Sequence, residues 1–193
     1  MKDEKIATRE SYGNALAELG RKNENIVVLD ADLAAATKTG VFKKEFPDRF
    51  FDIGIAEQDM ISTAAGLAAS NKIPYASTFA VFAAGRAYDQ IRNSMCSSTL
   101  PVKLCSTHSG LSAGPDGASH QRLEDISLMK GIPNMVVLSP ADEVATKSII
   151  KNISKDKNPT YVRLGRCDVP AIYEEGENFE IGTAKVHGEG QDV

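Results

Sequence analysis

Short apolar runs alternate with longer helix-like stretches along most of the chain, and this alternation restricts the fold more than any other feature of the sequence. Most of the runs lack a polar face, as strands do when helices cover both sides of a parallel sheet. The six runs are Ile26–Asp30, Phe51–Ile53, Pro74–Thr78, Val102–Ser106, Met135–Ser139 and Thr160–Leu164. The pattern predicts an α/β fold, doubly wound, with a mainly parallel sheet of about six strands and helices on both faces.

Five other stretches have the apolar spacing or the end signals of helices. They are Arg9–Asn23, Gln58–Ser70, Gly85–Ser97, His120–Lys130 and Ala141–Lys155. Tyr12, Leu16 and Leu19 form an apolar stripe on the first stretch, which would let it cover the sheet. Since open parallel sheets bind ligands at the carboxyl ends of their strands, the residues just after each run are the candidates for a site.

The composition argues against several classes of function. A net charge of −4 disfavours general binding to nucleic acid or to an anionic membrane. The three cysteines (Cys96, Cys105 and Cys167) have no CxxC spacing, which disfavours a disulfide framework or a zinc site and favours a reducing compartment. The charged start of the chain is unlike a secretory signal, and no apolar run approaches the roughly 18 residues of a transmembrane helix. We therefore expect a cytoplasmic protein.

Glu57 lies where the second apolar run meets the second helical stretch. An acid at that point is favourable because the helix dipole attracts negative charge, an effect worth roughly 0.3–1 kcal/mol at an exposed position. Asp59 could provide the same effect, whereas Gly54-Ile55-Ala56 ahead of Glu57 indicate that its side chain is partly buried. Glu57 is thus either a helix-start charge or an acid that acts on a ligand.

Three other strand ends each allow a structural and a functional interpretation. Asp32, after the first run, could cap a turn or face a ligand. Phe79 and Phe82, after the third run, have the spacing of an aromatic pair in a core, but they could also form a platform for a flat heterocycle. Arg163 and Arg166, at the last run, could hold a phosphate or be surface charges.

The segment after the fourth run is the most informative one. His108 and His120 enclose a loop rich in Gly, Ser and Ala that also contains Asp116. A single histidine is more often structural, but two of the chain's three histidines beside one loop favour a polar site for a small molecule. Their spacing fits neither a zinc finger nor the HExxH motif, so no metal-ligating residues are expected.

Taken together, these segments resemble the pyrimidine-binding domain of transketolases. The matching segments are, in family order, ATRESYGNAL, LDADL, GIAEQDM, STFAVFAAGRAYDQIRN, THSGLSAGPDGASHQ and RLGR. The resemblance extends from about Ala7 to Arg166 and implies a pyrimidine-binding domain over residues 1–168. Residues 169–193 resemble a linker and the start of the family's C-terminal domain, and the final GQDV is expected to be a cut.

The resemblance implies thiamine diphosphate as the cofactor. It also implies transfer of a two-carbon ketol unit from a ketose phosphate to an aldose phosphate, a reaction of the pentose phosphate pathway. In the family, an acid like Glu57 hydrogen-bonds the N1′ nitrogen of the cofactor's aminopyrimidine ring. By the same resemblance, Phe82 would stack on this ring with Phe79 beside it, and Asp32 would lie near the cofactor at a subunit boundary.

The resemblance further implies which residues meet the substrate. The catalytic residues would be Glu57, His108 and His120, and the substrate-binding residues would be Arg9, His108, Asp116, His120 and Arg166, with the two arginines on the sugar phosphate. One position departs from the family. Ala36 stands where many members have a phosphate-binding serine, and it is followed by Thr37.

A larger departure is that the GDG…NN motif, which holds the diphosphate and Mg²⁺ in this family, is absent from the sequence. The chain begins with its own Met1 just ahead of the matching part. We therefore expect Mg²⁺ and the diphosphate to be held by a separate N-terminal transketolase subunit. This chain alone would be inactive, and it would associate with itself as a homodimer or within a heterotetramer.

Three alternatives remain open. A 1-deoxyxylulose-5-phosphate synthase shares a similar acid, the TF and RAYDQ segments and the DGxxH loop, but its pattern runs to Asp-Arg where His108 stands here. The β-subunit of a 2-oxo acid dehydrogenase shares the fold but lacks this DGxxH arrangement. The chain could also be a non-catalytic assembly partner, although the retained Glu57, Phe82 and both histidines argue against degeneration.

Overall fold

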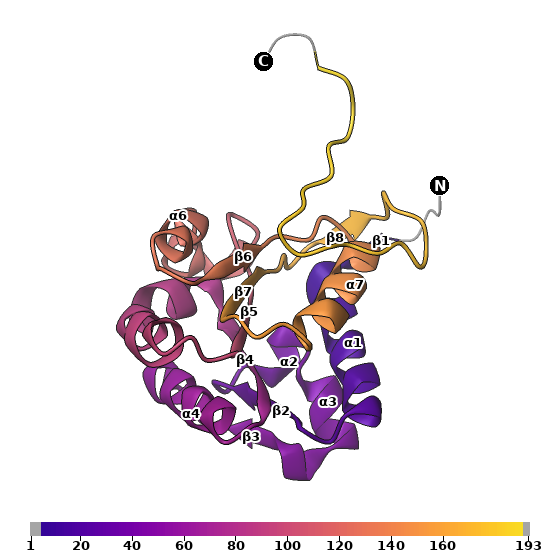
Figure 1. Ribbon diagram of the computed structural model, residues 1–193. Helices are drawn as coiled ribbons and strands as arrows, with labels where there is room; N and C mark the ends of the chain where they lie inside the picture. Colours follow the sequence, from indigo (N-terminus) through magenta and orange to yellow (C-terminus); the bar gives the residue numbers. More distant parts are fainter. Residues whose placement is uncertain (1–4, 191–193) are drawn as a thin grey trace.

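A computed structural model describes residues 5–190 and confirms the predicted α/β fold (Figure 1). Its main sheet has six parallel strands in the order β3-β2-β4-β5-β7-β6. The strands are β2 (Ile26–Asp30), β3 (Phe50–Asp52), β4 (Ile73–Phe79), β5 (Lys103–Thr107), β6 (Val136–Leu138) and β7 (Thr160–Arg163). Each of them confirms one predicted run. Met1 and the end of GQDV, on which two expectations rest, lie outside the described residues.

Helices cover both faces of the sheet, as predicted (Figure 1). One face packs against α1 (Thr8–Lys22), α3 (Gly40–Glu45) and α7 (Glu143–Ile153). The other packs against α4 (Glu57–Ala69), α6 (Asp125–Lys130) and a mixed π- and α-helical segment formed by η2 (Phe82–Arg86), α5 (Tyr88–Gln90) and η3 (Ile91–Ser97). Tyr12 and Leu16 of the expected stripe are fully buried, whereas Leu19 is only partly buried. No helix in this described part of the chain is long and apolar enough to cross a membrane.

Two expected helices differ from the structure. The helix expected from His120 is wrong over its first part, because α6 begins only at Asp125 and His120 ends the short 3-10 turn η5 (Ala118–His120). A backbone bridge between Gly110 and Arg122 folds the residues between them into a closed loop, which keeps His120 out of the helix. The helix expected to begin at Gly85 begins earlier in the chain, because Gly85 lies inside the π-helical turn η2, which starts at Phe82.

Several short elements are not predicted by the sequence pattern. The connection from β2 to β3 contains α2 (Ala34–Thr37), α3 and η1 (Pro47–Arg49). Two three-residue strands, β1 (Lys5–Ala7) at the start of the described chain and β8 (Asp168–Pro170) shortly after β7, pair antiparallel, with Ile6 opposite Val169. The expected domain boundary between residues 168 and 169 thus falls inside a paired strand, and the division of the chain at that point stays a prediction.

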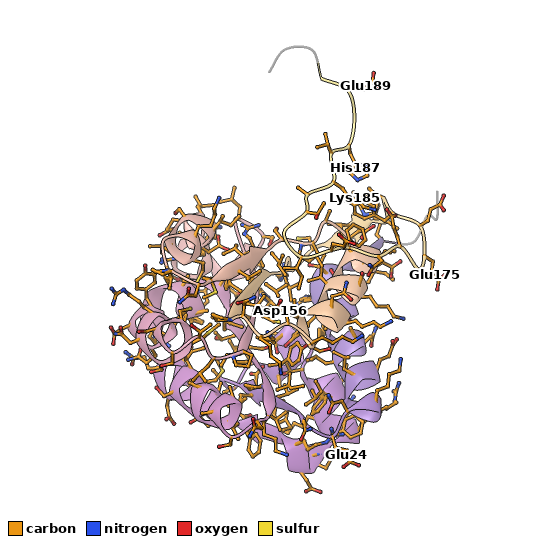
Figure 2. The ribbon with its side chains drawn as sticks, viewed as in Figure 1. Glu24, Asp156, Glu175, Lys185, His187 and Glu189 are labelled. Atoms are coloured by element: carbon orange, nitrogen blue, oxygen red, sulfur yellow. The ribbon has the colours of Figure 1, made fainter. Side chains whose placement is uncertain are left out.

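The segment after β8 passes over α7 and then extends away from the domain (Figure 1). The side-chain amide of Asn152 on α7 donates a hydrogen bond to the Phe179 carbonyl at 2.8 Å. Further along, His187 and Lys185 leave the body of the domain (Figure 2), and the His187 ring lies 4.8 Å from the ring of Tyr173. The chain's third histidine therefore belongs to this segment and not to the loop that carries the other two.

Lys103 is a buried cation at the start of β5. Its side chain is fully buried, and its Nζ donates hydrogen bonds to the carbonyl oxygens of Asp156 at 2.9 Å and Asn158 at 2.8 Å. Burial lowers the pKa of this amine from 10.5 to about 8. Between these two pH values the unfolded chain binds a proton that the folded chain lacks, so this group makes folding more favourable as the pH rises from about 8 to 10.5.

We expect Lys103→Met to flatten the alkaline part of the stability profile. Relative to this variant, the free energy of unfolding of the wild-type chain should rise by up to about 3 kcal/mol between pH 8 and pH 10.5. Urea denaturation at a series of pH values measures the two profiles. Profiles that stay parallel through this window would show that the amine is not perturbed in the folded chain.

Candidate active site

The carboxyl ends of β3, β2, β4, β5 and β7 lie together at one edge of the sheet, because these strands are parallel neighbours. Asp52, at the end of β3, connects two of the segments that follow them. Its Oδ1 accepts hydrogen bonds from the backbone N–H groups of Asp32 and Gly54, both at 3.1 Å. Asp32 is thereby held at this edge, exposed and with a positive φ of 62°.

Glu57 is the first residue of α4, and its side chain is only 1% exposed. Its Oε2 accepts a hydrogen bond from Nη1 of Arg86 at 2.7 Å. A carboxylate removed from water needs an opposite charge or several donors, and Arg86 provides the charge here. The neighbouring Asp59 is exposed, so Asp59 has the position of an ordinary helix-start charge and Glu57 does not.

Four rings from three different segments lie together beside Arg86, the residue that is paired with Glu57. Phe79 at the end of β4 is buried and stacks on His108, with ring centroids 3.8 Å apart. Phe82 is nearly parallel to Phe79 at 5.9 Å, and the His120 ring meets Phe82 edge-on at 5.4 Å. The fold therefore brings the predicted aromatic pair and both histidines of the loop into one cluster.

His108 directly follows β5, is only 3% exposed and has a positive φ of 58°. Its Nε2 lies 3.5 Å from Nη1 of Arg9, and its Nδ1 lies 2.9 Å from the hydroxyl of Thr107. A guanidinium can only donate, so the ring proton belongs on Nδ1, facing Thr107. Burial, and then the positive charges of Arg9 and Arg166, lower the pKa of His108 from 6.5 to about 4. The imidazole is therefore neutral at neutral pH.

The lowered pKa of His108 predicts a loss of stability in mild acid. Between pH 6.5 and about 4 the unfolded chain binds a proton that folded His108 does not, so the free energy of unfolding should fall by up to about 3 kcal/mol as the pH drops through this window. Asp30, whose pKa burial raises to about 6, acts in the opposite direction, so the difference between wild type and His108→Gln isolates the histidine. Denaturation of both proteins at a series of pH values measures it. Identical pH profiles for wild type and His108→Gln would contradict the assignment.

Arg9 and Arg166 approach the same part of the site from opposite ends of the chain. Nη1 of Arg9 donates to the Ala36 carbonyl at 2.9 Å, while its buried Nε has no hydrogen-bond partner among the described residues. Arg166 lies against Gly114, where a Cβ atom would be 2.8 Å from Nη1, and Gly114 has a positive φ of 68°. The positive charges of Arg9 and Arg166 both lower the pKa of His108, whereas the negative charge of the exposed Asp116 raises it. All predicted substrate-binding residues thus lie near one another.

Thr37 has a structural role and is not free to bind phosphate. Its hydroxyl is fully buried and donates to Oδ2 of Asp30 at 2.7 Å, and Thr39 donates to the same oxygen at 2.8 Å. Asp30 also accepts from the backbone N–H of Leu33 at 2.6 Å. Asp30 is therefore the capping residue of the turn after β2. Thr37 does not take over the role of the phosphate-binding serine that many family members have at the position of Ala36.

Arg163, the other arginine considered for phosphate, is tied to an acid inside the domain. Its Nε donates to Oδ2 of Asp125 at 2.9 Å, and the hydroxyl of Tyr161 donates to the same oxygen at 2.9 Å. Its Nη2 lies beneath Gly110, where a Cβ atom would be 3.1 Å away. Arg163 thus joins the two ends of the loop that carries Asp116 and His120, including its 3-10 turn η4 (Gly114–Asp116).

The pairing of Glu57 with Arg86 is the main feature of the site that the sequence does not predict. Arg86, Asp89 and Arg92 are spaced three residues apart, so a regular α-helix would carry them on one face, where they could form an intrahelical ion pair. In the structure Asp89 instead accepts from Asn93 at 2.6 Å, and the π-helical turn η2 directs Arg86 to Glu57. Among the described residues, no three His, Cys, Asp or Glu side chains lie together as a metal site would need.

Comparison with known protein families places these features in context. The family described as "Transketolase, pyrimidine binding domain" matches residues 4–171. A transketolase C-terminal section from Methanocaldococcus jannaschii is 52% identical over 187 residues, which are 96% of this chain and 59% of that protein. Human transketolase is 42% identical over 184 residues, which are 95% of this chain and 29% of that enzyme.

Solved structures give the same result. A structure described as a split-gene transketolase, an inactive β4 tetramer, has a TM-score of 0.83 and 54% identity over 92% of this chain and 57% of the other. Transketolase from Campylobacter jejuni has a TM-score of 0.80 and 26% identity over 90% of this chain and 28% of the other. The chain thus spans less than two thirds of these relatives.

Proposed function

The chain belongs to the transketolase pyrimidine-binding domain family, and on that premise we propose that it is the pyrimidine-binding subunit of a split, thiamine-diphosphate-dependent transketolase. The observation that carries this proposal is the edge of the sheet where a buried acid, stacked aromatic rings, two histidines and two arginines meet. Such an enzyme transfers a two-carbon ketol unit from a ketose phosphate to an aldose phosphate. This reaction belongs to the pentose phosphate pathway, and we assign it to the cytoplasm.

The residues at this edge fit the pyrimidine half of thiamine diphosphate. Glu57 would accept or donate a proton at N1′ of the ring, and the half-buried Phe82 would stack on the ring face, with Phe79 behind it. Asp32 would lie near the cofactor at a subunit boundary, because it is exposed at the same edge. When bound, thiamine diphosphate supplies the carbanion chemistry of ketol transfer, and the protein supplies orientation and electrostatics.

The other end of the site fits a sugar phosphate. Arg9 and Arg166 would hold the phosphate, since guanidinium groups match its geometry and charge. Neutral His108, together with His120 and Asp116, would hydrogen-bond the hydroxyl and carbonyl oxygens of the sugar. Because Nε2 of the neutral His108 imidazole can accept a proton, His108 can also move protons on these oxygens, with His120 beside it.

The diphosphate and its Mg²⁺ would be held by a separate N-terminal subunit. The GDG…NN motif is absent from the sequence, and apolar side chains beside the site are exposed: Ile55 is 76% exposed, and Leu111 and Leu123 are each 67% exposed. Exposed apolar groups that surround a polar site suit a surface that another subunit covers. The chain would act within a homodimer or a heterotetramer, with residues 1–168 as the pyrimidine-binding domain and residues 169–193 as a linker and the start of a further domain.

The reaction itself is the test of this proposal. The full-length chain is mixed with the diphosphate-binding subunit of the same organism, thiamine diphosphate and Mg²⁺. A ketose phosphate is then added as donor and an aldose phosphate as acceptor. Release of an aldose phosphate and two-carbon extension of the acceptor, followed by mass spectrometry, would support ketol transfer. Release of CO₂ from pyruvate in the presence of glyceraldehyde phosphate would instead identify a deoxyxylulose-phosphate synthase. Decarboxylation of a longer 2-oxo acid would identify a dehydrogenase β-subunit, and the absence of every reaction would identify an assembly partner.

A further inference from the structure

Arg86 contacts both residues that are proposed to hold the pyrimidine ring. Its Nη1 donates to Oε2 of Glu57 at 2.7 Å, and its Cζ lies 4.6 Å from the centroid of the Phe82 ring. Arg86 comes from the last position of the π-helical turn η2 that begins at Phe82. One guanidinium group therefore covers a face of the predicted stacking ring and satisfies the predicted acid at the same time.

A guanidinium resembles an aminopyrimidine ring in the properties that this site recognises. Both are flat, both present N–H donors in their plane, and both can stack on an aromatic face. We propose that Arg86 occupies the pyrimidine-ring position in the chain without cofactor, and that the ring displaces it on binding. This inference rests on the proposed function, because it takes Glu57 and Phe82 as the ring's two contacts.

The burial of the two charged side chains determines which of them can move. The side chain of Arg86 is 45% exposed, so its guanidinium can turn fully into water without crossing the packed core. The side chain of Glu57 is 1% exposed and begins a helix, so it cannot follow. A buried carboxylate left without a partner is costly, so as Arg86 leaves, Glu57 takes up one proton from solvent and shares it with N1′ of the incoming ring, which becomes its new partner. The exchange keeps Glu57 paired before and after binding.

The contact between Arg86 and Glu57 should therefore weaken binding of the pyrimidine ring. When a site must open before it binds, the apparent affinity falls by the fraction of molecules that are open. An ion pair with one exposed partner contributes modestly, so we expect removal of Arg86 to tighten binding roughly two- to fivefold. Arg86→Lys keeps the charge but lacks the flat guanidinium with its several N–H donors. Its affinity for the ring should lie between those of Arg86→Ala and wild type.

The probe is the free pyrimidine half of the cofactor, 4-amino-5-hydroxymethyl-2-methylpyrimidine, added to the 193-residue chain. Its dissociation constant is measured from the broadening of its proton NMR lines, and circular dichroism checks that each variant is folded. Arg92→Ala is the matched control. Arg92 belongs to the same helical segment, is exposed, and hydrogen-bonds Asn93 at 3.1 Å, so its loss should leave the affinity of the probe unchanged.

The order of the affinities decides the proposal. Tighter binding to Arg86→Ala than to wild type, with Arg86→Lys between them, supports it. Equal affinities, or weaker binding to Arg86→Ala that lysine restores, overturn it, and the second result would make Arg86 a positioning residue for Glu57. Should Arg86→Ala not fold, Arg86→Met gives the same comparison.

Phe82→Ala separates this proposal from the proposed function. If Phe82→Ala loses binding of the probe while Arg86→Ala binds no tighter than wild type, the ring site stands and the role of Arg86 is wrong. If neither wild type nor any Arg86 variant binds the probe, the ring site itself is wrong, and the inference on Arg86 fails with it.

Discussion

Glu57→Gln is expected to slow ketol transfer by the assembled enzyme about 10²–10⁴-fold, the range that loss of a positioned proton-transfer group costs. Glutamine has the same length and can still accept a hydrogen bond from Arg86, so the domain should stay folded. An amide cannot exchange a proton with N1′ of the pyrimidine ring, which is the role proposed for this carboxyl group. The rate of exchange of the cofactor's C2 proton with solvent deuterium, followed by NMR, should fall together with the transfer rate.

The neighbouring acid provides a control for this substitution. Asp59 lies in the first turn of the same helix and is exposed, so Asp59→Asn removes a helix-start charge without touching the site. We expect it to leave the exchange rate unchanged and to cost less than about 1 kcal/mol of stability. If both variants had the same small effect on exchange, Glu57 would be no more than a helix-end charge.

Arg166→Gln and Arg9→Gln are expected to raise the KM for a phosphorylated substrate by roughly 10- to 150-fold each. This range corresponds to the loss of a charge-assisted hydrogen bond, worth about 1.5–3 kcal/mol. The KM for the same sugar without its phosphate should change little, because the lost contact is to the phosphate. The ratio of the two KM values is therefore the measurement that isolates the arginines.

Two other arginines separate loss of this contact from loss of charge or stability. Arg21→Gln removes an exposed cation paired with Glu45 and should change neither KM. Arg163→Gln breaks the pair with buried Asp125, so it should lower the unfolding temperature and affect both substrates alike. If Arg9→Gln and Arg166→Gln raised the KM equally for both forms of the sugar, these side chains would not bind the phosphate.

Much of the fold follows from local sequence because the strands are buried on both faces. An apolar run such as Ile26–Asp30 needs no information from distant residues to be recognised as such a strand. The gathering of Glu57, Phe82 and His108 follows in turn, since each comes just after a parallel strand and neighbouring parallel strands end at the same edge. The sequence could thus indicate which residues meet without fixing how they meet.

What the sequence does not reveal depends on contacts between distant residues. β1 and β8 are three residues long and have no apolar pattern of their own, so only their pairing identifies them. The sequence predicts a helix over His120–Lys130, yet the bridge between Gly110 and Arg122 keeps His120 out of it. The pairing of Arg86 with Glu57 depends on a π-helical turn that shifts Arg86 around its helix axis. No local pattern in the sequence predicts that turn.

We infer that this chain carries one half of an active site. The most direct test titrates a fixed amount of the diphosphate-binding subunit with the full-length chain, in the presence of thiamine diphosphate and Mg²⁺, and measures ketol transfer. We predict no transfer with either subunit alone, and a rate that rises in proportion to added chain until the two are equimolar and then stays constant. Transfer by this chain alone, or no transfer at any ratio of the two subunits, would contradict the claim.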